Sequence, residues 1–234
     1  MIDFPLHLLD GCGVELDDTA RQRLNIYANL LIEWNEKMNL TAITDPVDVV
    51  IKHFLDSLTF FKCVQPENGA KIIDVGTGAG FPGMVLKIAR PDLEVTLLDG
   101  LNKRLVFLAE VAKQTGLSVE TLHLRAEEGG RKKELREQFD YACARAVAPL
   151  NVLLEYCVPF VKKGGSFIAL KGPAAKQEVK NAENAARLLG ADKPLLTAVT
   201  LTGDEERYIA QYKKISQTAP KYPRISAKIS KSPL

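Results

Sequence analysis

The amino-acid sequence predicts an α/β protein with a Rossmann-like, mostly parallel sheet, a C-terminal hairpin and an N-terminal helical extension. Three observations predict this fold. Short apolar strands alternate with helical segments from Lys71 onward, as they do in parallel βαβ units. A glycine-rich turn follows the first of these strands, and an acidic residue, Asp99, ends the second. The length of 234 residues suits one such domain with a small extension.

The composition is that of a globular protein. Apolar residues make up 46% of the chain and charged residues 26%, which is enough apolar material for a core. No apolar run reaches the roughly 18 residues of a membrane span, and the first residues lack the basic region of a signal peptide. The four cysteines do not show the CxxC spacing of zinc sites. We therefore expect a cytoplasmic protein that contacts neither a membrane nor a metal ion.

Residues 1–68 are expected to form the helical extension. Thr19 and Gln22 fit a capping box, and apolar residues with helical spacing follow as far as Met38. A second helix is expected to begin at Asp45 and Pro46, because Asp is a good N-cap and Pro suits the first turn. The turn-forming residues 66–69 then end this region.

Residues 69–216 are expected to form the α/β domain. Its predicted parallel strands span residues 71–75, 94–99, 119–124, 141–144 and 166–170. The predicted helices span residues 82–90, 102–115, 127–137, 150–161 and about 174–189. Two further runs, 195–201 and 207–215, are joined by residues 202–206 and are expected to close the sheet as a hairpin.

The turn at residues 74–83 could hold either of two ligands. Residues 78–83 satisfy the GxGxxG motif of dinucleotide sites, whereas a GxGxG spacing typical of S-adenosylmethionine sites is formed by Gly76, Gly78 and Gly80. Pro82 removes a backbone donor that a pyrophosphate needs at the helix start. The Asp74 carboxylate suits the positively charged, phosphate-free S-adenosylmethionine. This ligand is therefore favoured, and an NAD-dependent oxidoreductase remains the alternative.

If the ligand is S-adenosylmethionine, the transfer of its methyl group to a substrate is expected to need no catalytic side chain. Asp99 is placed to accept hydrogen bonds from ribose hydroxyls, which both ligands possess. After the fourth strand, residues 144–149 contain neither the Pro-Pro-aromatic turn typical of amino-group methyltransferases nor a Pro-Cys pair. Cys143 is expected to be a buried core thiol. A substrate atom that already has a free lone pair, such as guanine N7, needs no general base.

The C-terminal residues 217–234 are expected to form a basic tail. From Ile209 to Leu234 the chain has six Lys or Arg residues and no Asp or Glu. Such a segment suits a polyanion, because phosphate neutralisation releases counterions. It is equally consistent with a solvated tail that keeps the protein soluble. The basic cluster at residues 131–136 has the same two interpretations.

Several motifs together resemble one known family along nearly the whole chain. The bacterial 16S rRNA guanine-N(7) methyltransferase of the small-subunit type, also called glucose-inhibited division protein B, is similar at residues 34–41, 53–58, 74–83, 125–127, 144–150, 171–172, 222–224 and 231–234. One departure follows Arg224, where Ile225, Ser226 and Ala227 replace the lysine and glycines usual in that family.

The resemblance implies a class I S-adenosylmethionine-dependent methyltransferase fold and methyl transfer to N7 of a 16S rRNA guanine, guanine 527 of the 530 loop. Its partner would be 16S rRNA or the small ribosomal subunit. A non-enzymatic RNA-binding or assembly factor on the same fold is a further alternative. Together with Gly78, Gly80 and Asp99, the expected cofactor contacts are Gly76, Phe81, Ala126, Glu127 and Arg145.

The expected role of Arg145 is to bind the methionine carboxylate or to orient the guanine, with a surface ion pair as the alternative. His53 and Asp56 share a helix face and are expected to be structural. The residues expected to contact RNA are Lys171, Lys221, Arg224 and Lys228. A solvated basic face is the alternative for the group.

Overall fold

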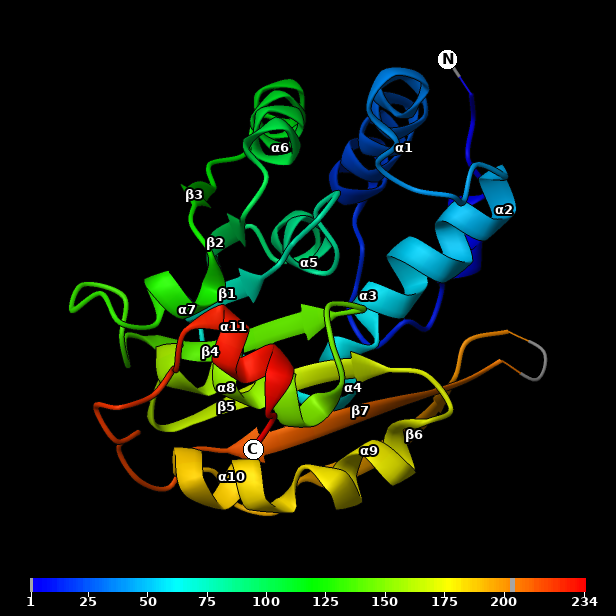
Figure 1. Ribbon diagram of the computed structural model, residues 1–234. Helices are drawn as coiled ribbons and strands as arrows, with labels where there is room; N and C mark the ends of the chain where they lie inside the picture. The colour runs from blue at the N-terminus through cyan, green and yellow to red at the C-terminus, as the bar shows by residue number, and fades with distance from the viewer. Residues whose placement is uncertain (1, 203–204) are drawn as a thin grey trace.

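A seven-stranded sheet with helices on both faces forms the centre of the protein in the computed structural model, which describes residues 2–202 and 205–234 (Figure 1). The strand order is β3-β2-β1-β4-β5-β7-β6. The strands are β1 (Lys71–Val75), β2 (Glu94–Asp99), β3 (Glu120–His123), β4 (Phe139–Arg145), β5 (Val161–Lys171), β6 (Leu195–Thr200) and β7 (Glu206–Lys213).

The first five strands are parallel, and β7 pairs in antiparallel fashion with both β5 and β6. The predicted Rossmann-like sheet and its closing hairpin are therefore confirmed. In the connection predicted at residues 202–206, Gly203 and Asp204 lie outside the described residues.

The helices of the domain follow the predicted order. They are α5 (Gly83–Ala89), α6 (Asn102–Thr115), α7 (Ala126–Gly129), α8 (Leu150–Cys157) with the 3₁₀ turn η3 (Val158–Phe160), α9 (Ala175–Asn181) and α10 (Glu183–Leu189). A further helix, α11 (Ser226–Lys231), lies in the C-terminal segment and was not predicted. The predicted helix at 127–137 is wrong beyond Gly129. A Cβ on Gly129 would lie 3.1 Å from Phe160, and one on Gly130 would lie 3.2 Å from Pro223, so both glycines allow close packing where the chain turns.

The N-terminal extension begins with the 3₁₀ turn η1 (Leu6–Leu9) and the long helix α1 (Asp18–Met38). The N-cap of α1 is Asp17, whose carboxylate accepts a hydrogen bond of 2.7 Å from the N–H of Ala20. The predicted capping box of Thr19 and Gln22 is therefore wrong by two residues. A carboxylate at this position also interacts favourably with the positive end of the helix dipole.

Four short segments continue the extension: α2 (Pro46–Asp48), the π-helix η2 (Val49–Leu55), α3 (Asp56–Leu58) and α4 (Phe60–Cys63). Asp45 caps the first of them, as predicted, and accepts hydrogen bonds from the N–H groups of Val47 and Asp48. A π-helical stretch is rare in proteins and is frequently found at functional sites.

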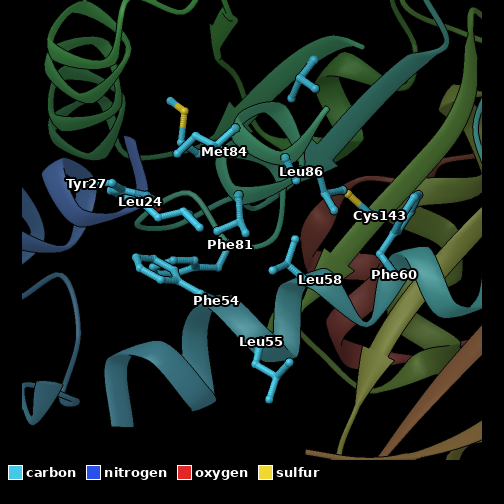
Figure 2. Close-up of a cluster of buried hydrophobic side chains, with 14 of the residues drawn as sticks. Leu24, Tyr27, Phe54, Leu55, Leu58, Phe60, Phe81, Met84, Leu86 and Cys143 are labelled. Atoms are coloured by element: carbon cyan, nitrogen blue, oxygen red, sulfur yellow. The ribbon is translucent and has the colours of Figure 1, made fainter. Parts of the chain in front are cut away.

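The extension shares one hydrophobic core with a face of the sheet. Tyr27 of α1 lies with its ring centroid 5.5 Å from both Phe54 of η2 and Phe81, which follows β1. Figure 2 shows these three rings in one buried cluster with Met84. Cys143 is fully buried in the same cluster, which confirms the predicted core thiol. The extension is thus part of the scaffold of the α/β domain.

The opposite face of the sheet is covered by α8, α10 and the C-terminal segment. This segment is basic, but it is not a free tail. Arg136 donates hydrogen bonds to the carbonyl oxygens of Thr218 and Tyr222, and Arg131 donates to that of Pro223. The predicted basic tail is therefore folded onto the domain. In the part of the chain that the structure describes, no helix is both long and apolar enough to span a bilayer.

Candidate active site

A cleft of about 530 Å³ opens at the carboxyl ends of β1, β2 and β4. This is the edge at which Rossmann-like sheets bind their ligands, and the volume is in the range of small-molecule sites. Four parts of the domain form its wall: the glycine turn after β1, the start of the segment after β2, Arg125 after β3, and the end of β4 with the residues that follow it. They are joined by Leu40, Thr41 and His53 from the N-terminal extension.

The glycine turn has the backbone geometry that the sequence predicts. Gly76, Gly78 and Gly80 all have positive φ, at 74°, 60° and 104°. A Cβ on Gly80 would lie 2.5 Å from the hydroxyl of Tyr27, so this position requires glycine. A Cβ on Gly78 would meet no atom closer than 4.0 Å, because this residue faces the open cleft. A ligand can therefore approach the main chain at Gly78.

Asp99 places a carboxylate in the cleft at the end of β2. Its side chain accepts hydrogen bonds from the N–H of Gly78 at 2.9 Å and from the N–H of Leu101 at 2.8 Å. Arg104, on the first turn of α6, donates to it at 3.3 Å. A carboxylate has about four acceptor sites, so Asp99 can accept a further hydrogen bond from a ligand hydroxyl.

Asp74 does not line the cleft. It is fully buried beneath the turn, where it accepts hydrogen bonds from the hydroxyl of Thr77 at 2.6 Å and from the N–H of Gly83 at 2.8 Å. Burial raises the pKa of the Asp74 carboxyl to about 6, against the opposing effect of these two hydrogen bonds. Asp74 was expected to place a carboxylate near the ligand; it shapes the turn from beneath, and Asp99 places its carboxylate in the wall of the cleft.

Arg145 joins β4 to the N-terminal extension through a buried cluster. Its guanidinium donates to the carboxylate of Asp56 at 2.7 Å, to the carbonyl oxygen of Lys52 at 2.8 Å and to Nδ1 of His53 at 3.2 Å. It also lies 4.9 Å from the centroid of the Phe81 ring. The Arg145 side chain is only 13% exposed. A surface ion pair, the alternative interpretation, is therefore wrong for this residue.

His53 connects this cluster to the wall of the cleft. Its ring stacks on Phe81 with centroids 4.4 Å apart, and its Nε2 lies 2.8 Å from the hydroxyl oxygen of Thr41. Burial, together with the charge of Arg145, lowers the pKa of His53 to about 3. The imidazole is therefore neutral at physiological pH. The expectation of a purely structural His53–Asp56 pair misses that both side chains bind Arg145, a residue of the cleft wall.

Ala126 and Glu127 begin α7, directly after the loop that follows β3. Both are half-buried, and the cleft wall at this point is formed by the preceding residue, Arg125. Their expected contact with the adenine edge of a cofactor remains a prediction.

Comparison with known proteins identifies the family. Residues 20–207 match the family model described as rRNA small subunit methyltransferase G. The chain belongs to this family. A ribosomal RNA small subunit methyltransferase G from Alkaliphilus metalliredigens is 50% identical over 232 residues, which cover 97% of each chain. The resemblance seen in the sequence motifs is thereby confirmed.

Two solved structures with low sequence identity show the same fold. A predicted O-methyltransferase from Agrobacterium tumefaciens superposes with a TM-score of 0.55 at 20% identity, over 70% of this chain and 81% of that one. An S-adenosylmethionine-dependent O-methyltransferase from Thermotoga maritima superposes with a TM-score of 0.53 at 17% identity, over 80% and 72%. The fold is that of class I methyltransferases, and family membership sets aside the alternative of an NAD-dependent oxidoreductase.

The cleft of this methyltransferase fits S-adenosylmethionine, the cofactor of its family. Asp99 offers the carboxylate that a ribose requires, and the open backbone at Gly78 leaves room beside it. This cofactor has a positive charge on sulfur and no phosphate, so the carboxylate in the wall stabilises it.

The residues expected to contact RNA differ in their surroundings. Lys171 is 10% exposed and forms an ion pair of 2.8 Å with Glu178. Arg224 is 14% exposed and forms one of 2.6 Å with the fully buried Glu155. These two side chains are neutralised within the protein, which argues against their binding RNA phosphates. Lys221 and Lys228 are exposed.

Several residues of the cleft wall were not singled out from the sequence. The place of Arg104 and Arg125 in the wall could have been predicted from the sequence, because Arg104 lies five residues after Asp99 and Arg125 directly precedes Ala126. Thr41 had no separate signal of its own. Its place in the wall depends on how the N-terminal extension folds over the sheet.

Proposed function

We propose that this protein transfers the methyl group of S-adenosylmethionine to N7 of a guanine in 16S rRNA. Family membership supports the cofactor and ribosomal RNA as the substrate, and the sequence resemblance supports guanine N7 and guanine 527. One observation of the structure carries most weight. A single cleft contains the carboxylate of Asp99, the open backbone at Gly78 and the guanidinium of Arg145, which is held by Asp56, so a cofactor and an electron-rich base can meet there.

The proposed cofactor position follows the order of the strands. Asp99, after β2, would accept hydrogen bonds from the ribose, and Ala126 and Glu127, after β3, would lie beside the adenine. The methionine end would lie against the glycine turn, with its carboxylate near Arg145. The expected contacts on that side are Gly76, Gly78, Gly80 and Phe81.

The reaction needs positioning more than proton transfer. Bound S-adenosylmethionine supplies a methyl group on a positively charged sulfur, which is reactive toward a lone pair. Guanine N7 has a free lone pair at neutral pH, so no side chain has to remove a proton before attack. The task of the protein is then to align the base with the methyl group and to exclude water. The low pKa of His53 agrees with a role in positioning.

The proposed RNA surface combines basic residues of the cleft wall with exposed lysines of the C-terminal segment. Arg104 and Arg125 lie in its wall, and Lys221 and Lys228 are exposed on the C-terminal segment. Their charges would hold phosphates of 16S rRNA or of the small ribosomal subunit, and counterion release would favour binding. An enzyme with this substrate would act in the cytoplasm.

A transfer assay tests the proposal. Tritiated S-adenosylmethionine is incubated with small ribosomal subunits that lack the modification, and the labelled nucleotide is identified by mass spectrometry. We expect label in 7-methylguanosine of 16S rRNA. Binding of RNA and cofactor without any transfer would instead support the alternative of a non-enzymatic assembly factor.

A further inference from the structure

Thr41 occupies a fixed position in the cleft wall, in the segment between α1 and α2. Its backbone N–H donates a hydrogen bond of 2.8 Å to the side-chain oxygen of Asn35. Asn39, which ends α1 with a left-handed backbone conformation, turns the chain toward this position. The side chain of Thr41 is thus presented to the cleft by a segment outside the sheet.

The hydrogen-bonding capacity of the Thr41 hydroxyl is constrained by its neighbours. A guanidinium has no acceptor, so Nδ1 of His53 must accept from Arg145, and the proton of the neutral ring is then on Nε2. Nε2–H therefore donates to the Thr41 oxygen at 2.8 Å, and the N–H of Ile43 donates to the same oxygen at 3.0 Å. Both lone pairs of the hydroxyl are occupied.

The hydroxyl proton of Thr41 is left to donate. Within residues 2–202 and 205–234, no hydrogen bond from this hydroxyl to an acceptor is found. Because Thr41 borders the cleft, a ligand is the available acceptor. A group of this kind can bind an acceptor oxygen but cannot accept from a donor, so it distinguishes ligands by their polarity.

We propose that the Thr41 hydroxyl donates a hydrogen bond to O6 of the target guanine and thereby selects guanine over adenine. The inference rests on the proposed function, since it concerns the base that is methylated. Guanine presents two acceptors on this edge, N7 and O6, whereas adenine presents N7 and an amino group that donates. An amino group facing the Thr41 hydroxyl would leave two donors opposed.

The carboxylate of the cofactor is the other acceptor that the cleft would contain. Arg145 lines the same cleft and matches a carboxylate better than a neutral hydroxyl does, because an ionised pair has the stronger hydrogen bond. The neutral donor at Thr41 matches the neutral O6. In addition, Thr41 comes from the N-terminal extension, whereas the loops after β1 and β2 form the glycine turn and the ribose site.

A cycle of two changes, one in the protein and one in the RNA, tests this assignment. The protein is the full chain with Thr41 or with Thr41→Val. The substrate is a small subunit with guanine or 2-aminopurine, which lacks O6, at the target. We expect Thr41→Val to lower kcat/KM about 10-fold more on guanine than on 2-aminopurine, the loss typical of one hydrogen bond. The loss of the hydrogen bonds from His53 and Ile43 is common to both substrates and cancels in the cycle.

Two further variants serve as controls. Thr41→Ser keeps the hydroxyl and should restore transfer to guanine, and Thr44→Val, at an exposed position three residues away, should leave it unchanged. The affinity for S-adenosylmethionine, measured by calorimetry without RNA, should be the same in all variants.

Additive losses in the cycle would overturn the assignment to O6, and so would weaker cofactor binding by Thr41→Val. Equal activity of Thr41→Val and the unmodified protein on guanine would also overturn it. A complete lack of transfer by the unmodified protein would instead contradict the proposed function itself.

Discussion

The cleft and the contact between the C-terminal segment and the domain each contain a buried carboxylate that is bound by an arginine and by backbone N–H groups, but the two carboxylates have different roles. In the C-terminal segment, Arg224 surrounds the buried Glu155 with hydrogen bonds from Nε and Nη2, and its own backbone N–H donates to the same carboxylate. In the cleft, the partners of Asp99 among residues 2–202 and 205–234 are two backbone N–H groups and the half-exposed Arg104. The Glu155 carboxylate is saturated from within, whereas Asp99 can still bind a ligand.

This difference shows how a charged residue is to be judged. Both carboxylates are almost inaccessible to solvent, at 3% for Asp99 and 0% for Glu155. Burial therefore does not distinguish the structural carboxylate from the one that can bind a ligand. The number and kind of their hydrogen-bond partners distinguish them, because a group with all its acceptor sites occupied stabilises the fold, whereas a group with a free acceptor site can bind a substrate or cofactor.

Removal of Asp99 should give the largest effect on function. Asp99→Ala deletes the acceptor proposed for a ribose hydroxyl, and a hydrogen bond to a charged group contributes about 2 kcal/mol. We expect affinity for S-adenosylmethionine to fall about 30-fold by calorimetry. Asp92→Ala, which removes a surface ion pair with Arg90, is the control and should bind the cofactor normally. Unchanged affinity in Asp99→Ala would place the ribose elsewhere.

Removal of Glu155 should give the opposite profile. Glu155→Ala leaves Arg224 without its partner in a largely buried position, which costs about 3 kcal/mol of the free energy of unfolding. The affinity for the cofactor in the folded protein should stay unchanged. Urea denaturation and calorimetry measure the two quantities. A loss of cofactor affinity without a loss of stability would contradict the separation of the two regions.

The sequence predicted the parts of the molecule in which local patterns decide the structure. The strand β1 and the helix α6 were predicted with their observed ends. The apolar periodicity of each segment marks them, and α6 begins shortly after Asp99, which ends the preceding strand. The positive-φ glycines of the turn and the place of Asp99 at the cleft were predicted for the same reason, because the glycine motif is continuous in the chain and Asp99 ends the neighbouring strand.

The remaining features depend on contacts between distant segments. Arg145 meets Asp56 and His53 across about 90 residues of chain, and no local pattern indicates this cluster. Arg136 was expected on a solvated or RNA-binding helix, but it binds carbonyl oxygens more than 80 residues further along. Charge was visible in the sequence, and the partners that neutralise it were not.

A smaller effect should appear in the dependence of stability on pH. The pKa of His53 is lowered to about 3 in the folded protein, so the unfolded chain binds an extra proton between about pH 6.5 and pH 3. The stability that His53 contributes is therefore lost as the pH falls through this window, by about 2 kcal/mol from pH 7 to pH 5. The raised pKa of Asp74 acts with the opposite sign, since the folded protein binds its proton first.

A His53→Gln variant separates the two groups. Relative to the unmodified protein, its free energy of unfolding should rise by about 2 kcal/mol on acidification from pH 7 to pH 5, because the loss caused by His53 is absent and the Asp74 contribution is common to both proteins. Urea denaturation at each pH measures it. Parallel curves for the two proteins would show that His53 titrates normally and is not held neutral by burial and the charge of Arg145.

The smallest effect should come from the exposed lysines. The double variant Lys221→Gln and Lys228→Gln should reduce the slope of log affinity for 16S rRNA against log salt by about 2, because two phosphate contacts are lost. Lys171→Gln, whose lysine is paired with Glu178, should leave the slope unchanged. Filter binding over a range of salt concentrations gives both slopes. If the slope changed more in Lys171→Gln than in the double variant, this would contradict the assignment of Lys221 and Lys228 as the lysines that contact RNA.

A crystal structure with S-adenosylhomocysteine, the product of methyl transfer, tests the assignment of the cleft most directly. We predict that the ribose hydroxyls hydrogen-bond to Asp99 and that the sulfur faces the end of β4, next to Arg145. A ligand bound elsewhere on the protein, or a ribose without contact to Asp99, would contradict the account.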